Sequence, residues 1–300
     1  MSISLQHISK SFKEVTALKN ISFDVKEGEL FGLIGPDGAG KTTLFRILTT
    51  LLFADEGTAA VADYDVVEDY KSIRNNVGYM PGKFSLYQDL TVEENLRFFA
   101  TIFNTTIEEN YDLIKDIYIQ IKPFKKRRAG KLSGGMKQKL ALCCALIHKP
   151  KVLFLDEPTT GVDPVSRKEF WEMLKRLQAK GITILVSTPY MDEAALCDRI
   201  ALIQDGQILE IDTPQEIVKH FPKKIYDVSA DNMYKLLLVL KEYTHCYSVY
   251  PFGEFMHYAD KRNDFNIEEL TLFLQEKGFN DIVIQPTKTT IEDTFMELAK

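Results

Sequence analysis

The chain has 300 residues, of which 45% are hydrophobic, and its formal net charge is -6 at pH 7. This length allows one large domain or two of moderate size, with enough apolar residues to bury a core. The acidic balance gives no indication of nucleic-acid binding, and no apolar stretch reaches the ~18 residues that span a bilayer.

The first expected elements are two strands within residues 2–27, the second of them at Ile21–Val25. Phe12 lies on the connection between them. An aromatic side chain there either covers the sheet or stacks on a planar ligand. The apolar run Leu30–Ile34 then predicts a buried strand.

A glycine-rich turn follows this strand and leads into an expected helix at Leu44–Leu52. Its sequence matches the phosphate-loop pattern G-x-x-x-x-G-K-[ST], and both flanking elements supply the required context. Glycines let backbone N–H groups surround a phosphate at the helix N-terminus. Lys41 supplies a charge for the β- and γ-phosphates, and the Thr42 hydroxyl is placed to ligate Mg²⁺. A turn that binds nothing is the disfavoured alternative. The predicted phosphate-binding residues are Gly35, Pro36, Asp37, Gly38, Ala39, Gly40, Lys41, Thr42 and Thr43.

The next part of the chain predicts short strands near 57–67 and 77–81, and after them the pattern changes from strands to helices. Residues 83–131 are mainly helical in pattern, and Thr91 with Glu94 forms a capping box at one helix start. A second helical stretch covers 107–120. We therefore expect a helical insertion in an otherwise α/β domain.

Two further buried strands, 151–157 and 182–187, have the apolar composition of central parallel strands. The first ends in Asp156 and Glu157, at the strand end that faces the ligand crevice of such sheets. Before it, Ser133 is the expected N-cap of a long helix. Asp163-Pro164 starts another helix, a hairpin covers 199–211, and the α/β core is expected to end near Asp212.

From residue 213 onwards the pattern changes to short strands with helices near 231–243 and 267–276 and at the C-terminal end. We expect a small appended α+β domain without a catalytic constellation.

Four stretches together resemble the nucleotide-binding subunit of an ABC transporter. They are the phosphate loop, Leu-Ser-Gly-Gly-Met at 132–136, the strand ending in Asp156-Glu157, and Pro-Thr-Thr-Gly-Val-Asp-Pro at 158–164. The tail looks like that of drug-exporting bacterial subunits, and 79–81 and 84–96 are close to the YbhF-like group. The resemblance implies a P-loop NTPase core, a mixed sheet with flanking helices, in a domain at 1–212. This domain has an antiparallel β subdomain and a helical subdomain at about 83–131, and 213–300 forms the accessory domain.

The resemblance also implies a mechanism. Two subunits close head to tail around two ATP molecules, and each site combines one phosphate loop with Ser133, Gly134 and Gly135 of the other subunit. Phe12 would stack on adenine, Thr42 and Asp156 would hold Mg²⁺, and Glu157 would polarise the attacking water. Asp163 would lie at the dimer seam, and residues 82–87 would contact a transmembrane permease. The subunit would then be peripheral, at the cytoplasmic face of the cell membrane, and would need no nucleic acid.

Two positions depart from the family pattern. Gly82 stands where the family has Gln, and Pro189 stands where it has His. Proline offers no side-chain donor and no backbone N–H, and the loss of one charge-stabilising group costs about 10²–10³ in rate. The expectation is a chain that binds MgATP, hydrolyses it weakly at its own site and completes the site of a second subunit. The alternatives are an ordinary hydrolysing homodimer and a soluble ABC-type ATPase that acts on ribosomes or DNA.

Overall fold

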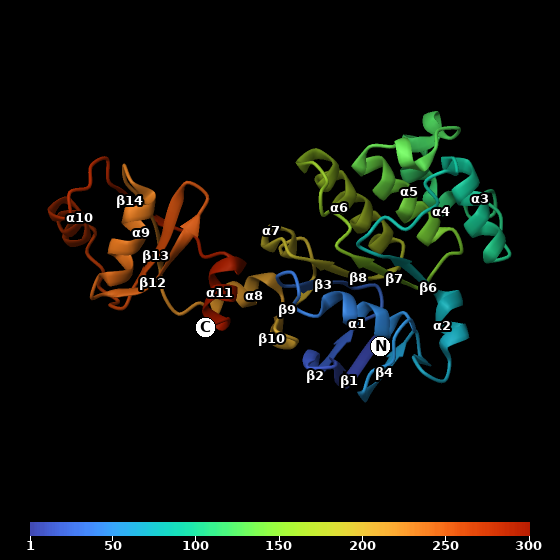
Figure 1. Cartoon of the computed structure of the whole chain (residues 1–300), viewed down its shortest axis with the longest axis horizontal. Coiled ribbons are helices and arrows are strands. Elements are labelled where there is room, and N and C mark those ends of the chain that lie inside the picture. The colour runs from blue at the N-terminus through green and yellow to red at the C-terminus, as the bar shows by residue number, and fades with distance from the viewer. The chain divides into compact units, whose positions relative to one another are not determined.

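A computed structural model describes all residues from 1 to 300, and the chain divides into two compact units, Met1–Pro214 and Gln215–Lys300. Each unit is described by itself (Figure 1). No helix is both long enough and apolar enough to cross a membrane.

A six-stranded mixed sheet forms the centre of the first unit, with the strand order β10-β9-β3-β8-β7-β6. All pairs are parallel except β9 with β10, which form a hairpin. Every residue of the three strands β3, β7 and β8 is buried, as expected for central parallel strands. The strands are β3 (Leu30–Ile34), β6 (Val77–Met80), β7 (Val152–Asp156), β8 (Thr183–Thr188), β9 (Arg199–Gln204) and β10 (Gln207–Asp212).

A second sheet of the first unit is antiparallel and has the order β2-β1-β4-β5. Its strands are β1 (Ile3–Phe12), β2 (Val15–Val25), β4 (Glu56–Val61) and β5 (Tyr64–Asp65). One face of β1 is buried, and its apolar residues share a core with α1 (Lys41–Leu48) and with β3 and β7. The expected mixed sheet and antiparallel subdomain are therefore both present. Phe12 is the last residue of β1, whereas the sequence predicted it on the connection between the two strands.

Three of the remaining helices of the first unit begin at the polar caps that the sequence predicted. Thr91 caps α3 (Val92–Ile102) in a capping box with Glu94, Ser133 caps α5 (Gly134–Leu146), and Asp163 caps α6 (Pro164–Ala179). Figure 1 shows α5 and α6 on one side of the six-stranded sheet and α1 on the other. The others are α2 (Tyr70–Asn76), α4 (Tyr111–Ile121), α7 (Met191–Ala194) and two short 3₁₀ helices at Lys122–Phe124 and Ala129–Lys131.

Two expected helices have different ends in the structure. The helix after the phosphate loop ends at Leu48 instead of Leu52, because Thr50 adopts a left-handed conformation with φ 63°. The second helix of the insertion starts at Tyr111 instead of residue 107, because the segment before it is a series of turns stabilised by side-chain hydrogen bonds of Thr106 and Glu109.

The second unit has the element order βαββαβ, followed by a terminal helix. Its antiparallel sheet has the order β12-β13-β11-β14, which is the ferredoxin-like arrangement. The two helices of this motif pack on one face of the sheet through a shared apolar core. The elements are α8 (Pro214–Lys219, which begins in the first unit), β11 (Ile225–Ser229), α9 (Met233–Glu242), β12 (Cys246–Phe252), β13 (Phe255–Asp260), α10 (Ile267–Glu276), β14 (Val283–Thr287) and α11 (Ile291–Leu298).

Polar contacts attach the terminal helix α11 to strands β12 and β13. The buried carboxylate of Asp293 accepts hydrogen bonds from Tyr250 Oη and from His257, whose Nδ1 lies 2.7 Å away. His257 Nε2 also lies 3.3 Å from Asp227 Oδ1 on β11. Hydrogen bonds and close polar contacts therefore satisfy these buried polar groups.

Candidate functional site

The phosphate loop connects β3 to α1 and passes very close to the backbone of two neighbouring strands. A Cβ on Gly35 would lie 2.0 Å from the carbonyl oxygen of Ile203 in β9. A Cβ on Gly40 would lie 2.4 Å from the carbonyl oxygen of Ala17 in β2, and Gly40 has φ 104°. Glycine is therefore required at both positions, because any side chain would collide with backbone.

Lys41, the first residue of α1, lies in the centre of this loop and is only 3% exposed. Its ammonium group donates hydrogen bonds to the carbonyl oxygens of Gly35 at 2.8 Å and Pro36 at 2.9 Å. It also lies 3.1 Å from Glu157 Oε1. A buried ammonium group needs such partners, so Lys41 is held where it can meet an anion bound in the loop.

The hydroxyl of Thr42 and the carboxylate of Asp156 meet at the end of β7. Thr42 Oγ1 donates to Asp156 Oδ2 at 2.8 Å, and Ser187 Oγ donates to Asp156 Oδ1 at 2.7 Å. One hydroxyl and one carboxylate beside a phosphate loop form a donor set that suits Mg²⁺, which takes its other ligands from phosphates and water. These residues therefore fit a magnesium ion.

Glu157 follows Asp156 and has an unusual backbone conformation with φ 51°. Its N–H donates to both oxygens of Ser187, at 3.1 Å to the carbonyl and 3.0 Å to the hydroxyl. A non-glycine residue in the left-handed region costs free energy and persists only where its surroundings impose it. The conformation therefore directs the Glu157 carboxylate to the phosphate loop instead of into the sheet.

The two unusual positions, Gly82 and Pro189, follow β6 and β8, the strands on either side of β7. A Cβ on Gly82 would lie 3.1 Å from the carbonyl oxygen of Asp156 and 3.8 Å from Glu157 Cβ. Pro189 directly follows Thr188, whose carbonyl oxygen accepts from Gly35 N at 3.3 Å. Both positions therefore adjoin the site, and neither residue brings a polar side chain to it.

The structure does not join the Ser133–Gly135 segment to the phosphate loop of the same chain. Ser133 Oγ instead accepts from Met136 N at 3.4 Å, so it caps its own helix. A Cβ on Gly135 would lie 2.7 Å from Ser166 Oγ at the start of α6. This segment therefore lies beside α6.

Asp163 and Phe12 lie outside the cluster around Lys41. Asp163 Oδ1 accepts from Ser166 N at 3.0 Å, and this hydrogen bond holds the pKa of the carboxyl below its ordinary value. Phe12 pairs with Val15 in the hairpin whose second strand passes Gly40, and its ring is 45% exposed. An exposed ring in this hairpin is available for stacking.

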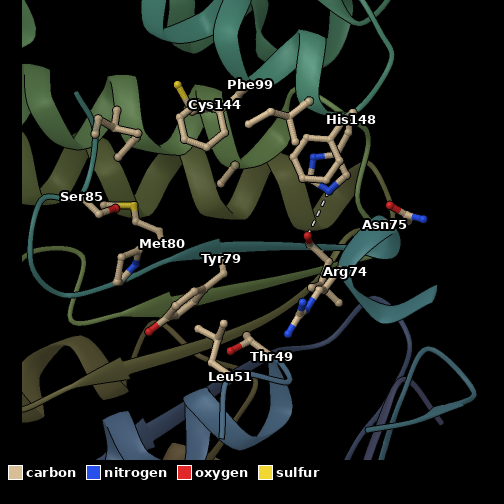
Figure 2. A pocket seen from close by; sticks show the side chains of 17 residues that line it. Thr49, Leu51, Arg74, Asn75, Tyr79, Met80, Ser85, Phe99, Cys144 and His148 are labelled. Carbon is tan, nitrogen blue, oxygen red and sulfur yellow. Dashed lines mark hydrogen bonds between the residues drawn. The ribbon is translucent and has the colours of Figure 1, made fainter. Parts of the chain in front are cut away.

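A pocket of about 510 Å³ lies between the sheet and the helical layer (Figure 2). His148, just after α5, stacks on Phe103 with ring centroids 3.8 Å apart, and its Nε2 donates to the carbonyl oxygen of Val77 at 3.0 Å. Burial lowers the pKa of His148, and burial raises the pKa of Tyr79 to about 12. Both groups are therefore neutral near pH 7. The exposed aliphatic side chains of Leu51 and Ile102 also line the pocket, which leaves an apolar surface open to a partner.

Reasoning from the sequence missed four polar residues near the site. They are Ser187, which orients Asp156, and a connected group of Thr159, Thr188 and Glu193. The available signal was the hydroxyl pair Ser187-Thr188 at the carboxyl end of a buried parallel strand, where ligand-facing groups are found.

Comparisons with known proteins agree with this geometry. Residues 18–160 match the protein family described as ABC transporter. The chain is 32% identical over 302 residues to the Nod factor export ATP-binding protein I of Rhizobium sp. (strain N33), and the match covers 99% of this chain and 97% of that protein. It is 42% identical over 217 residues to the probable multidrug ABC transporter ATP-binding protein YbhF of Escherichia coli (strain K12). That match covers 72% of this chain and only 38% of YbhF, so the chain spans well under half of that relative.

A solved structure with the same fold is the dimeric ATP-binding cassette MJ0796 bound to ADP and Pi. It is 26% identical, with a TM-score of 0.64, and the match covers 70% of this chain and 98% of that one.

Proposed function

The chain belongs to the ATP-binding subunits of ABC transporters, and on this premise we propose that it binds MgATP and powers the export of a drug or other small amphiphile through a separate permease. The observation that carries the proposal is the cluster of Lys41, Thr42, Asp156 and Glu157 at the carboxyl ends of β3 and β7. Members of this family generally hydrolyse ATP. The relatives named above are export proteins, which favours export over import.

Each residue of the cluster has a role in this proposal. The loop amides and Lys41 bind the β- and γ-phosphates. Thr42 and Asp156 hold Mg²⁺, which neutralises phosphate charge when bound. Glu157 is the residue that orients and polarises the attacking water. Ser187 supports this role, because it fixes the backbone of Glu157 and the carboxylate of Asp156.

A second nucleotide-binding subunit completes the site in our proposal. Gly134 and Gly135 leave exposed amides at the N-terminus of α5, which suits a γ-phosphate of the other subunit. Since Ser133–Gly135 lies beside α6 in this chain, its phosphate partner would come from a second chain. The dimeric form of MJ0796 is consistent with this arrangement. Asp163 would then lie at the seam, and Phe12 would stack on adenine.

We further propose that the site of this chain hydrolyses ATP weakly. Gly82 and Pro189 adjoin Asp156 and the phosphate loop, and they supply no hydrogen-bonding side chain. Two missing donors at a centre of developing charge reduce the rate of the chemical step while the binding residues remain intact. An ordinary homodimer in which Glu157 alone suffices is the alternative within the same family.

The permease would contact the pocket of Figure 2, at the cytoplasmic face of the membrane. Residues 80–86 run from the edge of this pocket past Gly82, which adjoins Asp156. A permease segment that fills the pocket would therefore be coupled through residues 80–86 to the end of β7 that carries Asp156 and Glu157. A soluble ABC-type ATPase acting on ribosomes or DNA is the alternative, and the relatives named as export proteins favour the permease.

Co-purification from membranes tests the proposal. A tagged chain is expected to sediment with membranes and to bring down a polytopic membrane protein, and a chain that sediments with ribosomes would contradict this.

The hypothesis of weak hydrolysis is tested by a Glu157→Gln substitution in this chain alone, compared with the equivalent substitution in its partner subunit. The partner's substitution is expected to reduce turnover far more. Equal losses would show that both sites hydrolyse ATP.

A further inference from the structure

The short helix α7 carries a buried carboxylate outside the phosphate cluster. Glu193 is 3% exposed and accepts hydrogen bonds from three side chains. Thr159 Oγ1 lies 2.8 and 3.0 Å from its two oxygens, Thr188 Oγ1 donates at 2.6 Å, and Arg167 Nε donates at 3.1 Å. An ionised carboxylate at this depth is stable only with such partners.

The two threonines belong to the two loops that adjoin the catalytic residues. Thr159 lies two residues after Glu157 at the end of β7, and Thr188 directly precedes Pro189 at the end of β8. Glu193 is therefore the group that joins the loop at 158–163 to the turn at 188–190. A change in position of either loop must act on this carboxylate.

Arg167 of α6 holds the same turn from its other side. Its guanidinium lies over the ring of Tyr190 at 4.3 Å and donates to Asp192 at 3.2 Å as well as to Glu193. The N–H of Tyr190 in turn donates to Thr188 Oγ1 at 3.1 Å. The neighbours of Pro189 therefore fix the turn, although the proline itself offers no donor.

We propose that Glu193, supported by Arg167, is a positioning residue for ATP hydrolysis. It holds the turn at 188–190 and the loop at 158–163 in fixed positions next to the bound phosphates. Pro189 offers no hydrogen-bond donor that could do this. The proposal rests on the proposed ATP-binding function. A misplacement of about 1 Å among reacting groups costs up to ~10²-fold in rate, so the carboxylate is expected to affect the chemical step rather than nucleotide affinity.

The test compares Glu193→Gln, Thr159→Val and the conservative Thr159→Ser in the full-length chain. Glu29→Gln is the matched control. Glu29 is also a buried acid, 7% exposed and 3.3 Å from Arg199, but it precedes β3 at the end of that strand opposite to the phosphate loop. The measurements are kcat and KM for ATP, the affinity for the fluorescent analogue TNP-ATP, and the melting temperature.

Glu193→Gln and Thr159→Val are expected to lower kcat by about tenfold to hundredfold, with KM and TNP-ATP affinity changed by less than about twofold. Thr159→Ser keeps the hydroxyl and is expected to retain most of the activity. Glu29→Gln is expected to lower the melting temperature without a comparable loss of kcat. Losses of kcat no larger than in the Glu29→Gln control would overturn the proposal.

Hydrogen–deuterium exchange provides a readout that does not depend on turnover. MgATP is expected to slow exchange in peptides covering 35–43, 188–195 and 158–163 of the unmodified chain. Glu193→Gln should reduce the protection of both 158–163 and 188–195, and Thr159→Val that of 158–163, while 35–43 stays protected in both variants. Unchanged protection of 158–163 would contradict the proposal. If the unmodified chain neither binds TNP-ATP nor shows protection at 35–43, the proposed function itself fails, and this proposal fails with it.

Discussion

Replacing Pro189 by histidine is expected to raise the ATPase rate of the chain. Thr188, the residue before it, pairs with Ile34 at the end of β3, and its carbonyl oxygen accepts from Gly35 N. Position 189 therefore lies beside the start of the phosphate loop, where our proposal places the bound phosphates. One preorganised donor at a developing charge is worth about 10²–10³ in rate, or ~2.7–4 kcal/mol. The gain should be nearer the lower value, because Gly82 still lacks a polar side chain.

Phosphate release by the purified chain at saturating MgATP measures this effect, and TNP-ATP titration shows whether affinity has changed. Pro189→Ala is the matched control, because it restores the backbone N–H without adding a side-chain donor. A gain in Pro189→Ala equal to that in Pro189→His would refute the assigned role of the side chain. No gain in Pro189→His, with nucleotide binding intact, would show that the missing donor does not limit turnover.

Three other predictions concern the loop beside the pocket, the C-terminal unit and the pocket itself. Asn95→Ala should lower the free energy of unfolding by about 2–3 kcal/mol in urea titrations, because the buried amide bonds the backbone of residues 87–91. Burial opposes ionisation of Asp293, but hydrogen bonds led by that from His257 outweigh it and hold the pKa of Asp293 low. Its contribution to stability should therefore be lost as the pH falls below about 3.9, and the melting temperature of Asp293→Asn should vary less with pH in this range. Leu51→Asp and Ile102→Asp should leave basal ATPase unchanged but abolish its stimulation by the co-purified permease, and full stimulation would exclude the pocket as the docking site.

The sequence predicted most of the first unit because its signals are local. The phosphate loop needs glycine where any Cβ would collide with β2 or β9. The starts of three helices are specified by the capping residues Thr91, Ser133 and Asp163. Helix ends were less predictable. Thr50 has no feature in the sequence that indicates its left-handed backbone, which ends α1 early.

Long-range polar contacts were the main part of the site that could not be predicted from the sequence. The hydrogen bonds of Glu193 join residues from β8, α6 and the loop after β7, which are 5 to 34 positions away. Only the sheet order brings these segments together. The sequence predicted an α+β domain for the second unit but not its ferredoxin-like strand order. Strand order depends on pairings that residue patterns do not specify.

The two unusual residues have a common consequence, because they follow the two strands that flank β7. The residues that would bind the phosphates and Mg²⁺ lie on the loop after β3, on α1 and at the end of β7, and Lys41, Thr42 and Asp156 all have hydrogen-bond partners. Gly82 and Pro189 follow the strands on either side of β7, and neither supplies a polar side chain beside Asp156 and Glu157. In our proposal, ATP binding and dimer closure depend on the first group, whereas charge stabilisation during hydrolysis would depend on polar side chains at the two positions of the second. Such a site should therefore bind ATP normally and release the closed state slowly, so that the partner's site would set the transport rate.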